Sequence, residues 1–229
     1  MTVQDYLQVG LGFILQVLLL QALIRNGGRQ YILLTLLVCS QFLGTVLHAS
    51  IVMSGTWSNT AKQYFWASEI TQNLLVFATI ITFIYNRLGR SDSTLRLGRW
   101  LILLAIAGAG LSLWIHSDIR VNLWMSSVTR DMTFIATFLN LILWGALLKN
   151  RDRDRLMMVS GGLGVQLAGY SMGQALRVLW ERSSTLIWIG DRVIVFSYLI
   201  SLLILYKAFR HAEYTLPGSK PRPDPPKSG

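Results

Sequence analysis

Long apolar runs recur along almost the whole chain, and this feature constrains the fold more than any other. Each run has about 20 residues, the length that an α-helix needs to cross ~30 Å of hydrocarbon. Charged residues make up 14% of the 229 residues and hydrophobic residues 52%. A soluble domain carries roughly a quarter charged residues. The sequence therefore predicts an all-α, polytopic membrane protein.

Short polar breaks, such as "RNGGRQ" (25–30) and "KNRDRDR" (149–155), separate the runs. The predicted spans form one seven-helix transmembrane domain over residues 1–208 and cover 5–24, 31–53, 65–86, 98–117, 126–148, 156–179 and 186–208. The first run begins with Asp5, has no basic segment before it and no small-residue cleavage motif after it. We therefore expect a retained helix and not a signal peptide.

The distribution of Lys and Arg predicts the orientation, because short basic loops stay in the cytoplasm. One side of the predicted topology holds fifteen of the 21 cations and five of the 11 acids. The other side is neutral, so the net charge of +10 lies on one face. This asymmetry predicts a multi-pass protein of the bacterial inner membrane, with its N-terminus outside and its C-terminus in the cytoplasm. It explains the high pI without nucleic-acid binding.

All five prolines lie within residues 209–229. This polar, Pro-rich and basic segment predicts a disordered cytoplasmic tail, too short for an enzymatic output domain. A solvated tail is the simpler interpretation, and docking of an SH3-like partner is the alternative. Because the spans contain no proline, the broken helices found in many secondary transporters are not expected.

Ionisable residues inside membrane spans are candidates for function, because their burial in hydrocarbon is costly. The predicted orientation puts all of them in the outer half of the bundle, together with one amide: Glu69, Arg130, Asp131, Gln174, Arg177, Asp191 and Arg192. Adjacent residues on a helix point about 100° apart, so Arg130 and Asp131 are expected to find partners on other helices. We expect Glu69 to face Arg130, and Asp131 to face Arg177 or Arg192.

This cluster has two interpretations that the sequence leaves open. It is either a structural ion-pair network that fixes the order of the helices, or the lining of an outward-opening pocket for a small polar or anionic ligand. A proton path, the third possibility, would need relays in the inner half, where the sequence places no acid or base.

Small residues recur along the sixth span at helical spacing and predict a packing face, formed by Gly162, Gln166, Gly169 and Gly173. Tyr170, Gln174 and Arg177 form an adjacent polar stripe. Three further polar residues, Gln41, Thr45 and Asn140, are expected to form hydrogen bonds between helices.

Several classes of protein are disfavoured. A retinal protein needs a lysine in the middle of the seventh span, whereas Lys207 lies at its end. His48 and His116 are too few for a di-heme cytochrome, and the single Cys39 excludes an internal disulfide. Because no catalytic motif occurs, we expect no enzyme activity, no cofactor and no metal.

The stretch "NRDRDRLMMVSGGLGVQLAGYSMGQALR" (150–177) resembles an uncharacterised family of small bacterial seven-helix membrane proteins. The layout also resembles, at the level of fold, the seven-helix sensor modules of bacterial receptors. Neither resemblance implies an activity. We expect a stand-alone membrane sensor, receptor or accessory subunit, in contact with the bilayer and with a cytoplasmic or membrane protein partner. A small solute transporter or channel, or a structural subunit of a larger complex, are the alternatives.

Overall fold

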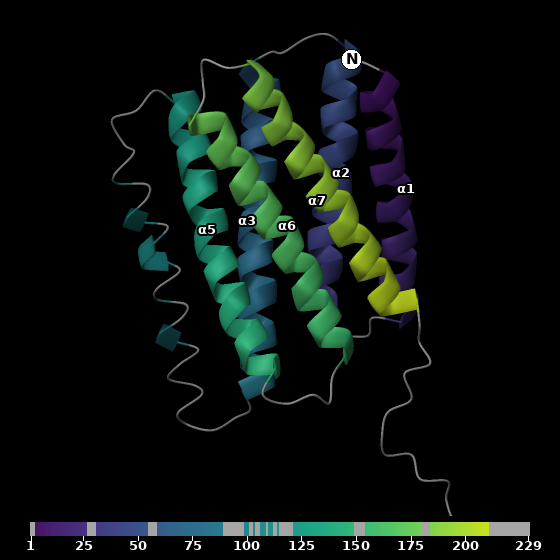
Figure 1. The fold of residues 1–229 in the computed structure, drawn as a ribbon, viewed down its shortest axis with the longest axis vertical. Coiled ribbons are helices and arrows are strands. Elements are labelled where there is room, and N and C mark those ends of the chain that lie inside the picture. The colour runs from purple at the N-terminus through teal and green to yellow at the C-terminus, as the bar shows by residue number, and fades with distance from the viewer. Residues whose placement is uncertain are drawn as a thin grey trace, which may run out of the picture.

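The computed structural model describes residues 3–26, 31–54, 59–88, 121–148, 154–179 and 184–210, with isolated positions between 99 and 114. These residues are helical, so the predicted all-α class is confirmed (Figure 1). The helices with described bounds are α1 (Val3–Asn26), α2 (Ile32–Ser54), α3 (Asn59–Leu88), α5 (Val121–Leu148), α6 (Asp154–Leu179) and α7 (Ser184–Arg210). Each of them overlaps one of the predicted spans.

Three of the helices are long and apolar enough to cross a membrane, within Leu7–Asn26, Ala67–Tyr85 and Thr185–Arg210. Helix α7 continues to Arg210, two residues into the segment predicted as a tail. Phe209 is fully buried there, because it packs edge-on against Tyr31 with ring centroids 4.9 Å apart. The remainder of the predicted tail, 211–229, lies outside the described residues, as does His116.

The ends of the helices carry residues that stabilise helix termini. Asn59 begins α3 and Ser184 begins α7, and both residue types favour a helix start. Asp154 lies at the N-terminus of α6, where a negative charge complements the helix dipole. Arg25 occupies the last turn of α1, and Lys207 and Arg210 the last turn of α7, where positive charge is favoured.

The six helices form a closed ring. Consecutive helices pack side by side (α1 on α2, α2 on α3, α3 on α5, α5 on α6 and α6 on α7), and α7 packs against α1 to close the ring. The isolated helical positions between 99 and 114 lie outside this ring beside α5, on the left in Figure 1. At Gly108 these positions come close to α5, because a Cβ atom there would lie 2.6 Å from Cδ1 of Ile135.

One end of the ring is filled with apolar side chains. The largest fully buried side chains all lie within nine residues of the helix end at the bottom of Figure 1: Leu19, Leu23, Leu34, Leu37, Ile80, Ile84, Leu139, Leu143, Leu163, Leu202, Leu205 and Phe209. At 1.5 Å per residue this layer is about 15 Å deep. Asn26 donates a hydrogen bond to the carbonyl of Phe209 (2.9 Å), and Arg155 lies over the Phe209 ring. We call this end of the bundle the apolar layer.

The outer surface of the ring is also apolar. Every helix exposes large hydrophobic side chains, for example Ile14, Leu43, Leu74, Phe134 and Phe196. Water-soluble monomers rarely expose apolar surface so continuously. A hydrocarbon environment removes this conflict, because both faces of a membrane helix can then be apolar.

Candidate functional site

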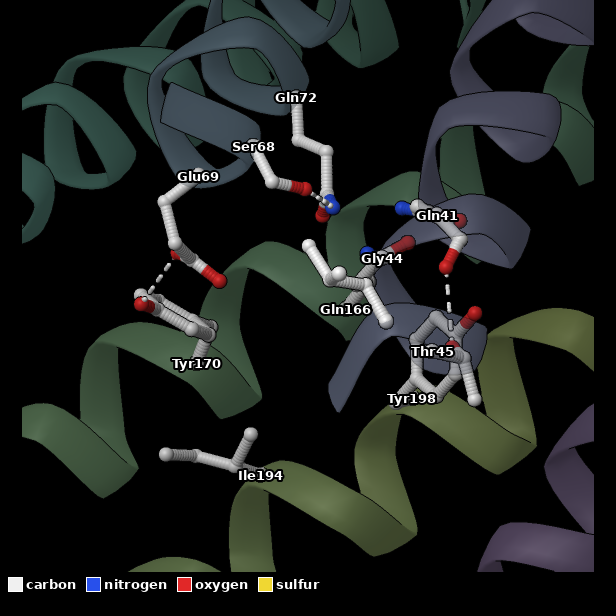
Figure 2. A pocket seen from close by; sticks show the side chains of 11 residues that line it. Gln41, Gly44, Thr45, Ser68, Glu69, Gln72, Gln166, Tyr170, Ile194 and Tyr198 are labelled. Atoms are coloured by element: carbon white, nitrogen blue, oxygen red, sulfur yellow. Dashed lines mark hydrogen bonds between the residues drawn. The ribbon is translucent and has the colours of Figure 1, made fainter. Parts of the chain in front are cut away.

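A cavity of about 310 Å³ lies inside the ring, between α2, α3, α6 and α7. We call it the central cavity (Figure 2). Its size is at the lower end of the range for small-molecule sites. Its lining is rich in amides and hydroxyls, and is formed by Gln41, Gly44, Thr45, Leu47, Ser68, Glu69, Gln72, Gln166, Tyr170, Ile194 and Tyr198. Most of these residues lie farther from the bottom of Figure 1 than the apolar layer does.

Among the described residues that line the central cavity, Glu69 is the only acidic one, and none is basic. The Tyr170 hydroxyl donates a hydrogen bond to Oε2 of Glu69, with the two oxygens 3.1 Å apart (Figure 2). Gln174, one helical turn after Tyr170, lies beside the same hydroxyl, and Arg177 interacts electrostatically with Glu69. A carboxylate can accept several hydrogen bonds, so Glu69 keeps acceptor capacity for a ligand.

Gln16 of α1 supports the opposite wall of the cavity from behind. Its Nε2 atom donates to Oγ1 of Thr45 at 3.1 Å and to the hydroxyl of Tyr198. Gln16 is fully buried, and its Oε1 atom has no hydrogen-bond partner among the described residues. Gln16 does not line the central cavity itself, so its role is to hold the Thr45 and Tyr198 side chains that do.

Gly44 lets α2 approach α3 closely at the cavity. A Cβ atom at this position would lie 2.8 Å from Nε2 of Gln72 and 3.0 Å from Oγ of Ser68. Those two polar atoms are themselves hydrogen-bonded at 3.1 Å, with Gln72 donating. Because Gly44 has no side chain, the Gln72 amide and the Ser68 hydroxyl have room to stay hydrogen-bonded at the cavity wall.

The predicted charge cluster is divided in the structure. Arg130 contacts Asp131, its neighbour in the chain, with Nη2 and Oδ1 3.2 Å apart, and not Glu69 as expected. Arg177 pairs with Asp191, with Nε and Oδ1 2.6 Å apart, and not with Asp131. Arg192 donates to Oε1 of Gln8 at 2.5 Å and lies over the Trp188 ring.

The expectation that Arg130 and Asp131 would not pair with each other was wrong, because the 100° between adjacent helix positions fixes only the Cα–Cβ directions. The arginine side chain is long enough to bend back to the carboxylate. Both side chains remain about one-third exposed, so water can solvate part of each of them.

The predicted packing residues of α6 all lie against α7. A Cβ atom at Gly162 would lie 3.1 Å from Cγ of Leu205, and one at Gly173 would lie 2.7 Å from the carbonyl oxygen of Gly190. Gly169 faces Ser197, and Gln166 accepts a hydrogen bond from Ser201 (3.5 Å). Glycines on this face thus allow α6 and α7 to pack closely.

The three polar residues that were expected to form hydrogen bonds between helices, Gln41, Thr45 and Asn140, make different contacts. Asn140 and Ser160 form a buried reciprocal pair, in which Asn140 donates to the Ser160 carbonyl and Ser160 donates to the Asn140 amide oxygen, both at 3.0 Å. Thr45 accepts the bond from Gln16, and its own hydroxyl donates to the Gln41 carbonyl. Thr45 and Gln41 also line the central cavity, which sequence reasoning did not anticipate.

Sequence reasoning missed further cavity residues on three helices, Gly44, Ser68, Gln72 and Tyr198, and also Gln16, which bonds Tyr198 from behind the wall. A signal for some of them was present, since Ser68 and Gln72 flank Glu69 on successive turns of α3. The side chain of His48 lies outside the described residues. Cys39 is half-buried in α2.

Comparison with models of protein families, with curated proteins and with solved structures found no match.

Proposed function

We propose that this chain is a seven-span protein of the bacterial inner membrane, with its N-terminus outside and its C-terminus in the cytoplasm. Two observations support the proposal. The outside of the helical ring is apolar at residues such as Leu43 and Phe134, and fifteen of 21 cations fall on one side of the predicted topology. In this orientation the apolar layer faces the cytoplasm and the charged residues Glu69 and Asp191 lie in the outer half.

The function that we propose is reversible binding of a small ligand, as in a membrane receptor or the ligand-binding accessory subunit of a membrane complex. The observation that carries the proposal is the central cavity. It combines a carboxylate, amides and hydroxyls on four helices, whereas the apolar layer below it is closely packed. A cavity that is closed on one side in this way can hold a solute without conducting it across the membrane.

The lining favours a ligand that donates hydrogen bonds and carries positive charge. Glu69 supplies negative charge, and none of the described lining residues is basic. The amide of Gln41 and the hydroxyl of Tyr198 can pair with the polar groups of a neutral portion of the ligand. An anion would meet Glu69 with no basic side chain among the described lining residues to bind it, so the anionic ligand considered from the sequence is disfavoured.

The proposal is tested by the thermal stability of the purified protein in lipid nanodiscs. A matched four-carbon series, putrescine, 1,4-butanediol and succinate, probes the sign of the ligand charge, followed by a library of small amines, polyols and carboxylates. We expect amines to raise the melting temperature most, because a ligand stabilises the state that it binds. Glu69→Gln should abolish this shift.

Asp191→Asn is the matched control, since Asp191 is an acid that pairs with Arg177 and does not line the central cavity. This variant should keep the shift. A library in which carboxylates are the only stabilising class would contradict the proposed ligand chemistry. Flux of a stabilising amine into proteoliposomes would favour the alternative of a transporter, because the apolar layer should prevent passage.

A further inference from the structure

A second cavity lies on the outside of the ring, between α5, α6 and the helical residues Ala107, Gly108 and Leu111. Two adjoining hollows of about 450 and 330 Å³ share Gly108, Leu111, Phe134 and Ile135. Together they form one groove, which we call the lateral groove. It is separate from the central cavity, because the two have no lining residue in common.

One end of the lateral groove is polar. Arg130 and Asp131 lie there as an ion pair, each about one-third exposed. Ser171 of α6 lines the same end, and its buried hydroxyl oxygen has no hydrogen-bond partner among the described residues. This end therefore offers a cation, an anion and an unused hydroxyl donor.

The other end of the groove is apolar. Phe134 and Phe138 follow Arg130 by one and two turns of α5, so this wall extends about 12 Å towards the middle of the bundle. Ala107 and Leu111 form the facing wall. Phe134 and Phe138 are 69% and 55% exposed, which makes this wall accessible from the surroundings of the ring.

We propose that the lateral groove binds a single phospholipid whose headgroup joins a phosphate to a primary ammonium. The phosphate would be bound by Arg130 and by the Ser171 hydroxyl, the ammonium by Asp131, and one acyl chain would lie along Phe134 and Phe138. In a zwitterionic headgroup the negative phosphate can pair with Arg130 and the positive ammonium with Asp131. A purely anionic headgroup would meet Asp131, and a trimethylated ammonium would lack the N–H groups that a carboxylate accepts.

The test is retention of lipid by the full-length protein, measured by native mass spectrometry after reconstitution into equimolar phosphatidylethanolamine, phosphatidylcholine and phosphatidylglycerol. The wild-type protein should retain one phosphatidylethanolamine in preference to the other two lipids by about threefold to fivefold, the size of effect expected for a partly exposed ion pair. Asp131→Asn should reverse the preference towards phosphatidylglycerol, because Arg130 is then uncompensated.

Ala175→Leu narrows the polar end of the groove and should reduce the retained phosphatidylethanolamine to background. Ala168→Leu is its matched control on the same helix, because Ala168 is exposed and does not line the groove. Equal retention of the three lipids by the wild-type protein would overturn the proposal. So would an unchanged preference in Asp131→Asn, or equal loss in the two alanine variants. These outcomes do not bear on the central cavity.

Discussion

Glu69 shows how a single acid is accommodated inside the bundle. Its carboxylate faces the central cavity and accepts a hydrogen bond from Tyr170 on α6, a helix that does not adjoin α3 in the ring. The bond therefore crosses the interior of the ring. Because a hydrogen bond to a charged group contributes more than a neutral one, this contact couples the position of the Glu69 side chain to that of α6.

Replacement of Tyr170 by Phe should destabilise the protein by about 1–3 kcal/mol, because Glu69 loses its donor while it remains in a poorly solvated place. The melting temperature in nanodiscs measures the effect. Tyr206→Phe on α7 is the control, since the Tyr206 hydroxyl does not bond Glu69, and it should change stability much less. A smaller loss for Tyr170→Phe in a Glu69→Gln background would establish that the two side chains act together. Additive losses would refute it.

The ion pair of Arg177 with Asp191 should contribute little to stability. The two side chains are 41% and 46% exposed, and exposed ion pairs contribute about 0–1 kcal/mol. We therefore expect Asp191→Asn to lower the free energy of unfolding by less than about 1 kcal/mol. Unfolding in denaturant measures the change. A loss as large as that of Tyr170→Phe would mean that the outer ion pairs hold the bundle together.

Sequence reasoning identified the charged residues but not their partners. The hydropathy of the spans singles out Glu69, Arg130 and Asp191, because each is a charged residue in an apolar run. Their pairing depends on how far a long side chain can bend and on which helices adjoin. The sequence of one chain does not contain this information directly. Gln16 illustrates the same limit, since an isolated amide on α1 gives no indication that it bonds Tyr198 on α7.

At the scale of the helix, the contact of α6 with α7 depends on glycine. A Cβ atom at Gly173 would lie 2.7 Å from the carbonyl oxygen of Gly190, and one at Gly190 would lie 2.8 Å from the carbonyl oxygen of Gly173. The obstacle is backbone in both cases, so a side chain cannot be accommodated by a change of rotamer. The helices would have to separate.

Gly173→Ala should therefore destabilise the protein by about 1–3 kcal/mol, as overpacking does in a close-packed interior. Gly161→Ala is the matched control on the same helix, because a Cβ atom there would meet nothing within 4 Å. Alanine is the better helix former by about 1 kcal/mol, so this variant should be neutral or more stable. The melting temperatures of the two variants compare the effects. Equal changes would mean that α6 and α7 are not in close contact at Gly173.

The spacing of Gly162, Gly169 and Gly173 predicts a packing face without indicating which helix lies against it. In water, the polar side of an amphipathic helix shows which side faces outwards. Here the exposed residues Leu203 and Phe196 of α7 are as apolar as the buried Leu202 and Leu205. The apolar pattern therefore predicts well where the helices lie in the sequence, and predicts poorly which helices pack against each other.

At the scale of the whole molecule, the central cavity and the fully buried apolar side chains lie at different depths along the bundle axis, although the buried Asn140–Ser160 pair lies within the apolar layer. The central cavity and the ion pairs of Arg130 and Arg177 lie towards one end, and the apolar layer fills the other. The depth of each charged residue could be estimated from its place within a span. The closure of the ring could not be predicted from the sequence, because it depends on the contact of α1 with α7, which are far apart in the chain.

The proposed orientation gives a prediction for the intact protein. Single cysteines are introduced by Lys62→Cys and Arg96→Cys in a chain whose only native cysteine is replaced by Cys39→Ser. They report on the two sides of the predicted span 65–86. A membrane-impermeant maleimide applied to spheroplasts should label position 62 and leave position 96 unlabelled until the cells are lysed. The physical reason is the concentration of Arg and Lys on the side of Arg96, which holds that side in the cytoplasm. Labelling of position 96 alone would reverse the orientation and place the apolar layer, not the central cavity, towards the outside. Labelling of both positions before lysis would mean that α3 does not cross the membrane, and the seven-span topology would then be wrong.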